Sequence, residues 1–424
     1  MTEEFLQYIW KHALFNRSEL ITTEGKPIEI VRSGLHNSDA GPDFFNAQIR
    51  IDNTLWAGNV EVHIKASDWF RHNHQIDKAY KNVILHVVWE NDKDIELSDG
   101  FVVPTLLLKD FVASDIFKKY EELKSSSKSI PCEKDIQKVD QITLTSWLDR
   151  LVAERLERKT DLIVSNLEKS INDWEETFYR LILRTLGNPI NSEPFERLAN
   201  VLPFKIIHKH RANLLQVEAL LLGQAGFLEE NFNDEYVVKL QQEYRYLKNK
   251  LNLTPMSKSE WKFMRIRPPQ FPTIRLAQLA SVIHSQEHLF REAMEADTEF
   301  DIIKLFSVKP SEYWQNHFQP DKPSTRQAGP IGKSTIEILM INAVIPTMFI
   351  YGRHTGKDEI SEKALDILHV IKAEKNSIVK KWDAIGIKAS DAYESQALLQ
   401  LRKEYCDLRK CVNCAIGHQL MKVK

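Results

Sequence analysis

Three segments between residues 27 and 65 alternate apolar and polar residues with a period of two, which constrains the fold more than any other feature. They are PIEIVRSG at 27–34, NAQIRIDN at 46–53 and NVEVHIK at 59–65. This period is typical of β-strands. A fourth apolar segment, KNVILHVVWEND at 81–92, follows a polar stretch in which we expect one helix. Because the first 15 residues have helical spacing, the predicted order is helix, three strands, helix, strand.

The chain changes character after the serine-rich segment 125–129. Beyond it, apolar residues recur at helical spacing and strand-like segments nearly vanish. Short polar segments rich in serine commonly separate domains. We therefore predict an α+β protein, with a mixed αβββαβ domain at 1–124 and a mostly helical domain at 130–424 that carries a C-terminal cysteine cluster.

Composition points to an ordinary globular protein. The 424 residues carry a net charge of −2, which favours neither presence nor absence of a nucleic-acid partner. Two glutamates near the start stand where a secretory signal would be positive. The longest apolar stretch, 336–351, is interrupted by polar residues and proline and is shorter than the about 20 residues that span a bilayer. We expect a cytoplasmic protein with no membrane segment.

Ionisable side chains mark one face of the third strand. Glu61, His63 and Lys65 alternate with apolar residues, so Glu61 and His63 emerge about 6–7 Å apart on the same side. Asp43 follows Pro42 just before the second strand. Phosphodiester hydrolysis is helped by a hard cation held by carboxylates. We therefore predict Mg²⁺ or Mn²⁺ at Asp43 and Glu61, with His63 or Lys65 handling the water.

The same residues have a structural interpretation. Asp43 caps a turn, Glu61 and Lys65 pair on the solvent face of an antiparallel sheet, and His63 lies between them.

Two further histidines, His72 and His74, follow in the same domain. Histidines two residues apart bind Zn²⁺ or Mn²⁺ when the chain is extended. They are also common in surface loops, which is the alternative. If they converge with the acids, the site is instead that of a histidine and aspartate metallohydrolase.

Cysteines form a second candidate metal site. Cys406, Cys411 and Cys414 lie within nine residues, and Cys132 is the remaining cysteine. Such short spacing lets thiolates face a common ion. Four thiolates suit Zn²⁺ and also a [4Fe–4S] cluster. The alternative is a buried apolar Cys132 and a partly reactive trio.

A basic segment at 262–275 interleaves cations with aromatic and apolar residues. Arg265, Arg267 and Arg275 are candidates for phosphate contacts, with an aromatic ring stacking on a base. The alternative is a buried connector whose arginines pair with acids of neighbouring helices.

The motif Pro42-Asp43 followed by Glu61-Val62-His63, in an αβββαβ order, resembles the PD-(D/E)XK nuclease superfamily. The resemblance covers about the first hundred residues and implies a metal-dependent nuclease. It departs from the family pattern at position 63, where histidine replaces lysine. The superfamily often adds an acid from the first helix, for which Glu4 and Glu19 are candidates.

Across nearly its full length the chain resembles a bacterial family of unknown function, number 2851. The segments that carry the resemblance are GPDFFNAQIRI, GNVEVHIKASDW, NVILHVVWEND, EALLLGQAGFL, RIRPPQFPTIRLAQLA and YCDLRKCVNCAIG. This family implies no activity. The leading hypothesis is a metal-dependent nuclease acting on DNA or RNA. The alternatives are a non-catalytic nucleic-acid-binding or scaffold protein with a structural metal clasp, and a protein-assembly factor.

Overall fold

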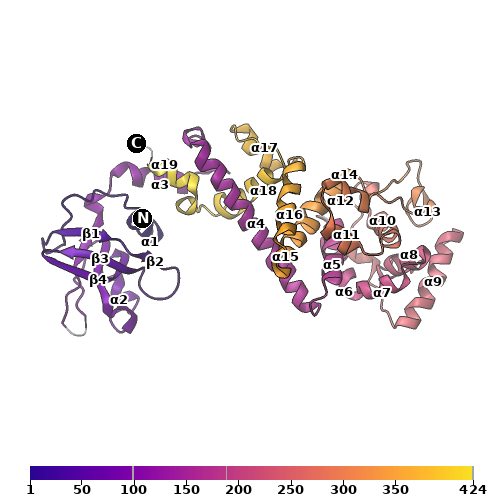
Figure 1. Cartoon of the computed structure of the whole chain (residues 1–424), viewed down its shortest axis with the longest axis horizontal. Coiled ribbons are helices and arrows are strands. Elements are labelled where there is room, and N and C mark those ends of the chain that lie inside the picture. Colours follow the sequence, from indigo (N-terminus) through magenta and orange to yellow (C-terminus); the bar gives the residue numbers. More distant parts are fainter. Residues whose placement is uncertain (98–99, 188, 423–424) are drawn as a thin grey trace. The chain divides into compact units, whose positions relative to one another are not determined.

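The chain divides into two compact units in the computed structural model, which describes residues 1–97, 100–187 and 189–422 (Figure 1). Unit 1 comprises Met1–Trp147 and Leu401–Lys424, and unit 2 comprises Leu148–Gln400. The β-sheet lies in unit 1 and unit 2 is mostly helical. The predicted α+β class is confirmed.

The boundary between the units differs from the predicted one. The division falls inside helix α4 (Gln141–Lys169), not at the serine-rich segment 125–129. The C-terminal residues return to unit 1, where Nη2 of Arg409 donates to the carbonyl oxygens of Ser126 at 2.8 Å and Lys128 at 3.0 Å. These bonds fix the polar segment, so it does not act as a linker, and the proposed domains 1–124 and 130–424 are corrected accordingly.

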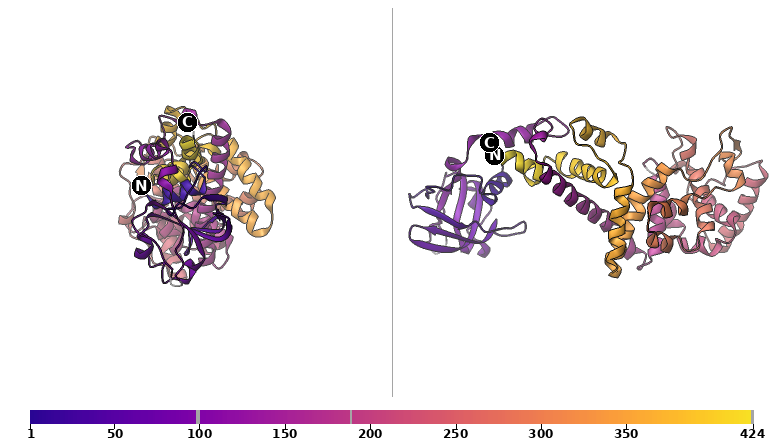
Figure 2. Two further views of the ribbon diagram at one scale, coloured as in Figure 1. Left: turned by 90° about the vertical axis from the view of Figure 1, so that its left-hand side faces the viewer. Right: turned by 45° about the horizontal axis from the view of Figure 1, so that its top comes forward.

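Unit 1 contains a mixed β-sheet (Figure 2, right). The sheet has six strands in the order β1-β3-β4-β5-β6, with β2 paired to β3. β1, β3 and β4 are antiparallel neighbours, whereas β4, β5 and β6 are parallel. The strands are β1 (Ile28–Arg32), β2 (Leu35–His36), β3 (Phe44–Ile51), β4 (Thr54–Lys65), β5 (Val83–Glu90) and β6 (Thr105–Leu107). The predicted helix before β5 is short, consisting of α2 (Asp68–Arg71) and the 3₁₀ turn η1 (Lys78–Asn82).

The sequence of β5 explains its central position. Its first six residues, VILHVV, are all buried. A near-continuous apolar run is typical of a parallel strand covered on both faces. His86 is the one polar residue in that run and is fully buried.

The other elements of unit 1 are helices and helical turns, and some of them bring the two ends of the chain into contact. They are α1 (Glu3–Lys11), η2 (Leu108–Phe111), α3 (Ser114–Ser125), η3 (Ile136–Lys138), the π-helix η7 (Leu401–Cys406), η8 (Cys411–Asn413) and α19 (Ala415–Lys422). Tyr8 on α1 hydrogen-bonds His418 on α19 at 2.6 Å, and Nδ2 of Asn413 donates to Glu4 at 3.0 Å. The C-terminal segment thus packs directly on the first helix.

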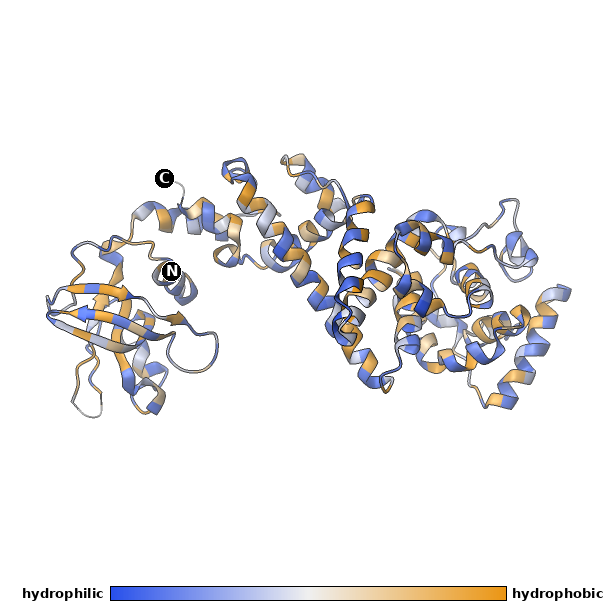
Figure 3. Cartoon of the chain, in the orientation of Figure 1, coloured by the Kyte–Doolittle hydropathy of each residue, from blue (hydrophilic) through white to orange (hydrophobic). Residues whose placement is uncertain are grey.

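Unit 2 is built from amphipathic and fully buried helices. They are α5 (Trp174–Leu186), α6 (Ser192–Val201), α7 (Phe204–His210), α8 (Leu214–Gln224), α9 (Glu235–Leu251), α10 (Pro272–Ser285), α11 (Leu289–Glu295), α12 (Glu299–Phe306), α13 (Glu312–Gln315), α14 (Lys333–Leu339), α15 (Ile345–Thr355), α16 (Asp358–Val370), α17 (Ser377–Ala384) and α18 (Ala392–Gln400), with turns η4 (Lys258–Glu260) and η5 (Pro268–Gln270) and a small hairpin of β7 (His317–Gln319) and β8 (Lys322–Pro323). Hydrophilic and hydrophobic residues alternate along α9 (Figure 3), as one buried face requires.

One helical stretch, Lys333–Thr355, is long and apolar enough to cross a membrane by length and composition. It runs through α14, the π-helix η6 (Met340–Val344) and α15. Within the unit, 67% of its most apolar window is buried. In the π-helical turn, the carbonyl oxygen of Ile341 accepts a hydrogen bond from Nζ of Lys159 at 2.8 Å. The burial of the stretch Lys333–Thr355 within unit 2 supports its interpretation as a core helix of that unit.

Candidate metal centre

The candidate site is built on β4, which pairs with β3 on one side and β5 on the other. Glu61 is 4% exposed and His63 is 1% exposed. Val60 and Val62, which alternate with them, are also buried. Both faces of the strand are therefore covered, and the solvent-facing arrangement of the structural alternative is wrong.

A β-bulge brings the two predicted acids together. β3 and β4 pair in a single register along most of their length, and a bulge at the start of β3 shifts it by one residue. Phe44 consequently pairs with Val60 rather than with Glu61. Asp43 takes the position beside Glu61. Asn46, inside the bulge, has a φ of 55°, which asparagine tolerates better than most residues.

Hydrogen bonds orient both carboxylates. The backbone N–H of Asp43 donates to Oε2 of Glu61 at 3.1 Å, and Oδ2 of Asp43 accepts from the N–H of Val62 at 3.0 Å. Oδ1 of Asp43 accepts from Nε2 of Gln7 at 2.8 Å. Since both oxygens of Asp43 are engaged, this residue positions the site. Oε1 of Glu61 is left to face the histidines.

Two histidines contact Oε1 of Glu61, and a third lies beside one of them. Nε2 of His74 lies 3.2 Å from that oxygen and Nε2 of His63 lies 3.5 Å from it. Nδ1 of His72 is 3.2 Å from Nε2 of His63. One ring nitrogen from each histidine falls within 4.8 Å of the others. The structure thus brings Glu61 and His63 together with His72 and His74, which the sequence analysis treated as two separate sets.

This spacing fits a metal ion. Ligands bound tetrahedrally to Zn²⁺ at 2.0–2.1 Å stand about 3.3–3.4 Å apart, close to the 3.2 Å between the ring nitrogens of His63 and His72. Oε1 of Glu3 lies 3.8 Å from Nε2 of His63. Among the described residues, Oε1 of Glu3 and Nε2 of His74 are buried without a hydrogen-bond partner. A cation at this point would satisfy both.

The loop after α2 holds two of the histidines. Asn73 between them has a φ of 63°, which turns the chain sharply. The ring of His74 stacks on Tyr80 with centroids 3.7 Å apart, which fixes its orientation. His74 is 9% exposed, whereas His72 is exposed. The group is therefore open to solvent on the side of His72.

His86 on β5 supports His63 from behind. Nδ1 of His63 lies 2.9 Å from Nε2 of His86. A histidine that binds metal through Nε2 carries its proton on Nδ1 and donates it to a neighbouring acceptor. His86 provides that acceptor.

Burial sets the protonation of the group. It lowers the pKa of His63 to about 2 and that of His86 to about 3. Burial also raises the pKa of Glu61 to about 8 and, together with repulsion from Glu61, that of Asp43 to about 7. Neutral imidazoles are the form that binds metals, and a nearby cation favours ionised carboxylates.

Lys65 does not join this group. Its ammonium lies 3.5 Å from Oε2 of Glu90 on the neighbouring strand, with both side chains about half exposed. The structure therefore gives no support to its predicted role beside His63. Its pairing with Glu61 in the structural alternative is also wrong.

The acid supplied by the first helix is Glu3, not Glu4 or Glu19. Glu4 accepts a hydrogen bond from Asn413, and Glu19 is exposed. Glu3 and Gln7 are four residues apart and so share one face of α1. Sequence spacing alone does not reveal which face of α1 meets the sheet. His86 was a detectable sign of a functional residue, because it is the one polar residue in the apolar run of β5.

Comparison with known proteins places the chain in a family. The family model described as "Protein of unknown function (DUF2851)" matches residues 3–377. The chain belongs to this family. No curated protein and no solved structure matches it significantly. The matched range of the DUF2851 protein includes the whole histidine group and ends before Cys406. The comparisons give no support to the nuclease-superfamily resemblance.

All four cysteines of this DUF2851 protein lie in unit 1 and line one small cavity. Cys132, Cys406 and Cys414 are buried and Cys411 is partly buried. The cysteines from the two ends of the chain are thus brought together as the sequence predicted, although in unit 1 and not in the helical unit.

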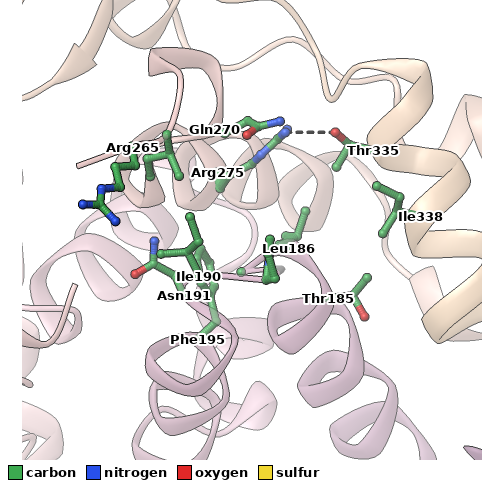
Figure 4. Close-up of a pocket in the computed structure, with 13 residues that line it drawn as sticks. Thr185, Leu186, Ile190, Asn191, Phe195, Arg265, Gln270, Arg275, Thr335 and Ile338 are labelled. Atoms are coloured by element: carbon green, nitrogen blue, oxygen red, sulfur yellow. Dashed lines mark hydrogen bonds between the residues drawn. The ribbon is translucent and has the colours of Figure 1, made fainter. Parts of the chain in front are cut away.

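The three predicted nucleic-acid arginines of the DUF2851 protein have different environments. Arg265 and Arg267 are exposed. Arg275 is 5% exposed and lines a cavity of about 160 Å³ (Figure 4). Its guanidinium donates to Gln278 at 3.0 Å and Thr335 at 2.9 Å. Arg275 is therefore part of the packed interior, and its proposed contact with nucleic acid is corrected.

Proposed function

We propose that the protein is a metal-dependent phosphodiesterase that cleaves DNA or RNA, with Mn²⁺ or Zn²⁺ held by His63, His72 and His74. One observation carries the proposal: three imidazole nitrogens lie within 4.8 Å of one another, and those of His63 and His74 lie 3.5 Å and 3.2 Å from Oε1 of Glu61. Three imidazoles favour Mn²⁺ or Zn²⁺ over Mg²⁺, which prefers oxygen ligands. From the sequence, Mg²⁺ or Mn²⁺ was expected at the carboxylates of Asp43 and Glu61; the proposal keeps Mn²⁺, adds Zn²⁺ and assigns the ion to the histidines.

When bound, a divalent ion supplies positive charge to a phosphate oxygen and makes a water molecule more acidic. The residues of the protein have separate tasks around it. Oε1 of Glu3 has no partner and faces His63, so it is placed to accept the proton of the attacking water. His72 lies at the exposed side, where substrate arrives. Gln7 and Asp43 keep Glu61 in position through their hydrogen bonds.

Two features support a nucleic acid as the substrate. With the two-residue strand β2 left out, the element order α1, β1, β3, β4, α2, β5 is similar to the αβββαβ order of the nuclease superfamily. The sequence resemblance assigns its two acids to Asp43 and Glu61. Exposed Arg265 and Arg267 lie in a segment with aromatic residues, which suits phosphate and base contacts.

The test combines metal analysis with a cleavage assay. Purified full-length protein is expected to bind about one Mn²⁺ or Zn²⁺ at this site and to cleave single- or double-stranded DNA or RNA when supplied with that ion. His63→Ala and His74→Ala should lose both properties. His288→Ala, at an exposed histidine of unit 2, is the matched control and should keep both. Cleavage that persists in His63→Ala would refute the proposal.

A non-catalytic nucleic-acid-binding protein is the second candidate, favoured by one observation. The lysine expected beside the acids is replaced by His63, and Lys65 is paired with Glu90. This candidate predicts salt-dependent nucleic-acid binding without cleavage in the presence of each ion.

A further inference from the structure

Four cysteines that the metal centre does not use surround a single cavity in unit 1. Cys132 follows α3, while Cys406, Cys411 and Cys414 lie at the start of the C-terminal segment. All four are free thiols that line this cavity. Four sulfur atoms facing one space form a ligand set for a metal centre.

The spacing of the sulfur atoms distinguishes between the possible centres. Four thiolates bound to one Zn²⁺ at about 2.3 Å stand about 3.8 Å apart at tetrahedral geometry. No three of these four described cysteines bring their Sγ atoms within 4.8 Å of one another. In a cluster each thiolate binds a different iron, so the sulfur atoms stand further apart.

We propose that Cys132, Cys406, Cys411 and Cys414 hold a [4Fe–4S] cluster. The cluster is a structural clasp that joins the C-terminal segment to the loop after α3. This inference does not depend on the phosphodiesterase proposal, because the cysteine cavity shares no residue with the histidine group.

The backbone around Cys414 is suited to such a cluster. The backbone N–H groups of Ile416 and Gly417 lie close to its sulfur. Hydrogen bonds to cluster sulfurs tune and stabilise these centres. A Cβ at Gly417 would lie 2.2 Å from the carbonyl oxygen of Cys411, so only glycine allows this close approach.

The clasp also supports the first helix. The segment that it anchors contacts α1 through Asn413 with Glu4 and through His418 with Tyr8. The same helix carries Glu3, which lies 3.8 Å from His63, and Gln7, which donates to Asp43. Loss of the cluster should therefore loosen the C-terminal segment first and weaken the support of α1 second.

Elemental analysis of full-length protein purified without oxygen tests the inference. The expected result is about four iron atoms and four acid-labile sulfides per chain, with a broad visible absorption that bleaches on reduction. One tightly bound zinc at these thiols, or metal-free thiols that react at once with an alkylating agent, would overturn the proposal.

Variants separate the two sites. Cys406→Ser and Cys411→Ser should lose iron and sulfide, and the C-terminal segment should become sensitive to limited proteolysis. His63→Ala should keep the full iron and sulfide content, which makes it the control for a folded unit 1. Iron and sulfide retained in a variant that combines Cys406→Ser with Cys411→Ser would refute the assignment. If the serine variants fold poorly, the iron and sulfide content of the wild-type protein still tests it.

Discussion

Nδ1 of His63 lies 2.9 Å from Nε2 of His86, and both rings are buried on neighbouring parallel strands. His86 is therefore a hydrogen-bond partner for a candidate ligand and not itself part of the ligand group. The contact leaves Nε2 of His63 facing Glu61 and His72. It fixes the ring orientation of His63.

Replacing His86 should weaken metal binding without removing a ligand. His86→Phe fills a similar volume but offers no acceptor, and loss of such a partner typically costs 10–100-fold in metal affinity, so we expect a decrease of about that size. Competition with a metal-binding dye measures it. His36→Phe, on exposed β2 of the same unit, is the matched control. Equal affinities of both variants and the wild type would contradict this role.

The bulge that pairs Phe44 with Val60 should depend on Asn46. A β-branched residue at its φ of 55° is strained by roughly 1–2 kcal/mol, whereas glycine is not. Asn46→Val should therefore lower the free energy of unfolding of unit 1 by about that amount, and Asn46→Gly should not. Because the side chain is exposed, lost packing does not explain such a difference. Urea unfolding of both variants measures it.

The arginines of the 262–275 segment should separate into two classes. Arg265→Ala combined with Arg267→Ala should reduce the slope of log affinity against log salt by about 1–2. Arg275→Ala should leave that slope unchanged and lower thermal stability, because it leaves the partners Gln278 and Thr335 unpaired in the interior. Fluorescence anisotropy with labelled oligonucleotides at several salt concentrations distinguishes the classes. A reduced slope in Arg275→Ala would contradict its buried position.

Glu218 should make the stability of unit 2 depend on pH. It is fully buried on α8, and burial raises its pKa to about 7. Its Oε2 accepts hydrogen bonds from Tyr236 at 2.7 Å and from Trp314 at 3.1 Å. An acid with a raised folded-state pKa stabilises the fold fully below its unfolded pKa, near 4.5. That contribution is lost as pH rises towards 7.

Glu218→Gln removes this titration. The variant should gain stability relative to the wild type between pH 4.5 and 8, by up to about 3 kcal/mol at 1.36 kcal/mol per pKa unit. Comparing urea unfolding of the two proteins at pH 5 and pH 8 gives the change. If the free energies of unfolding of the variant and the wild type differ by the same amount at pH 5 and pH 8, the pKa of Glu218 is not raised by burial.

The sequence by itself determined four strands of the sheet, the α+β class and the residue types of both candidate sites, but not the short strands β2 and β6. Period-two alternation fixed β1, β3 and β4 because side chains of a strand alternate between two faces. The apolar run at 81–92 indicated the fourth strand, β5. Local spacing also identified the cysteine trio, because its members are neighbours along the chain.

Tertiary structure decided which of these residues meet. A one-residue bulge placed Asp43 beside Glu61, and the packing of α1 selected Glu3 over Glu4. The turn at Asn73 brought His72 and His74 to His63, whereas Lys65 was drawn to Glu90. The register of β3 on β4, the rotation of α1 about its axis and the packing of the C-terminal segment in unit 1 depend on contacts between residues distant in sequence. Their energies are absent from any local pattern, so only the folded chain reveals the group.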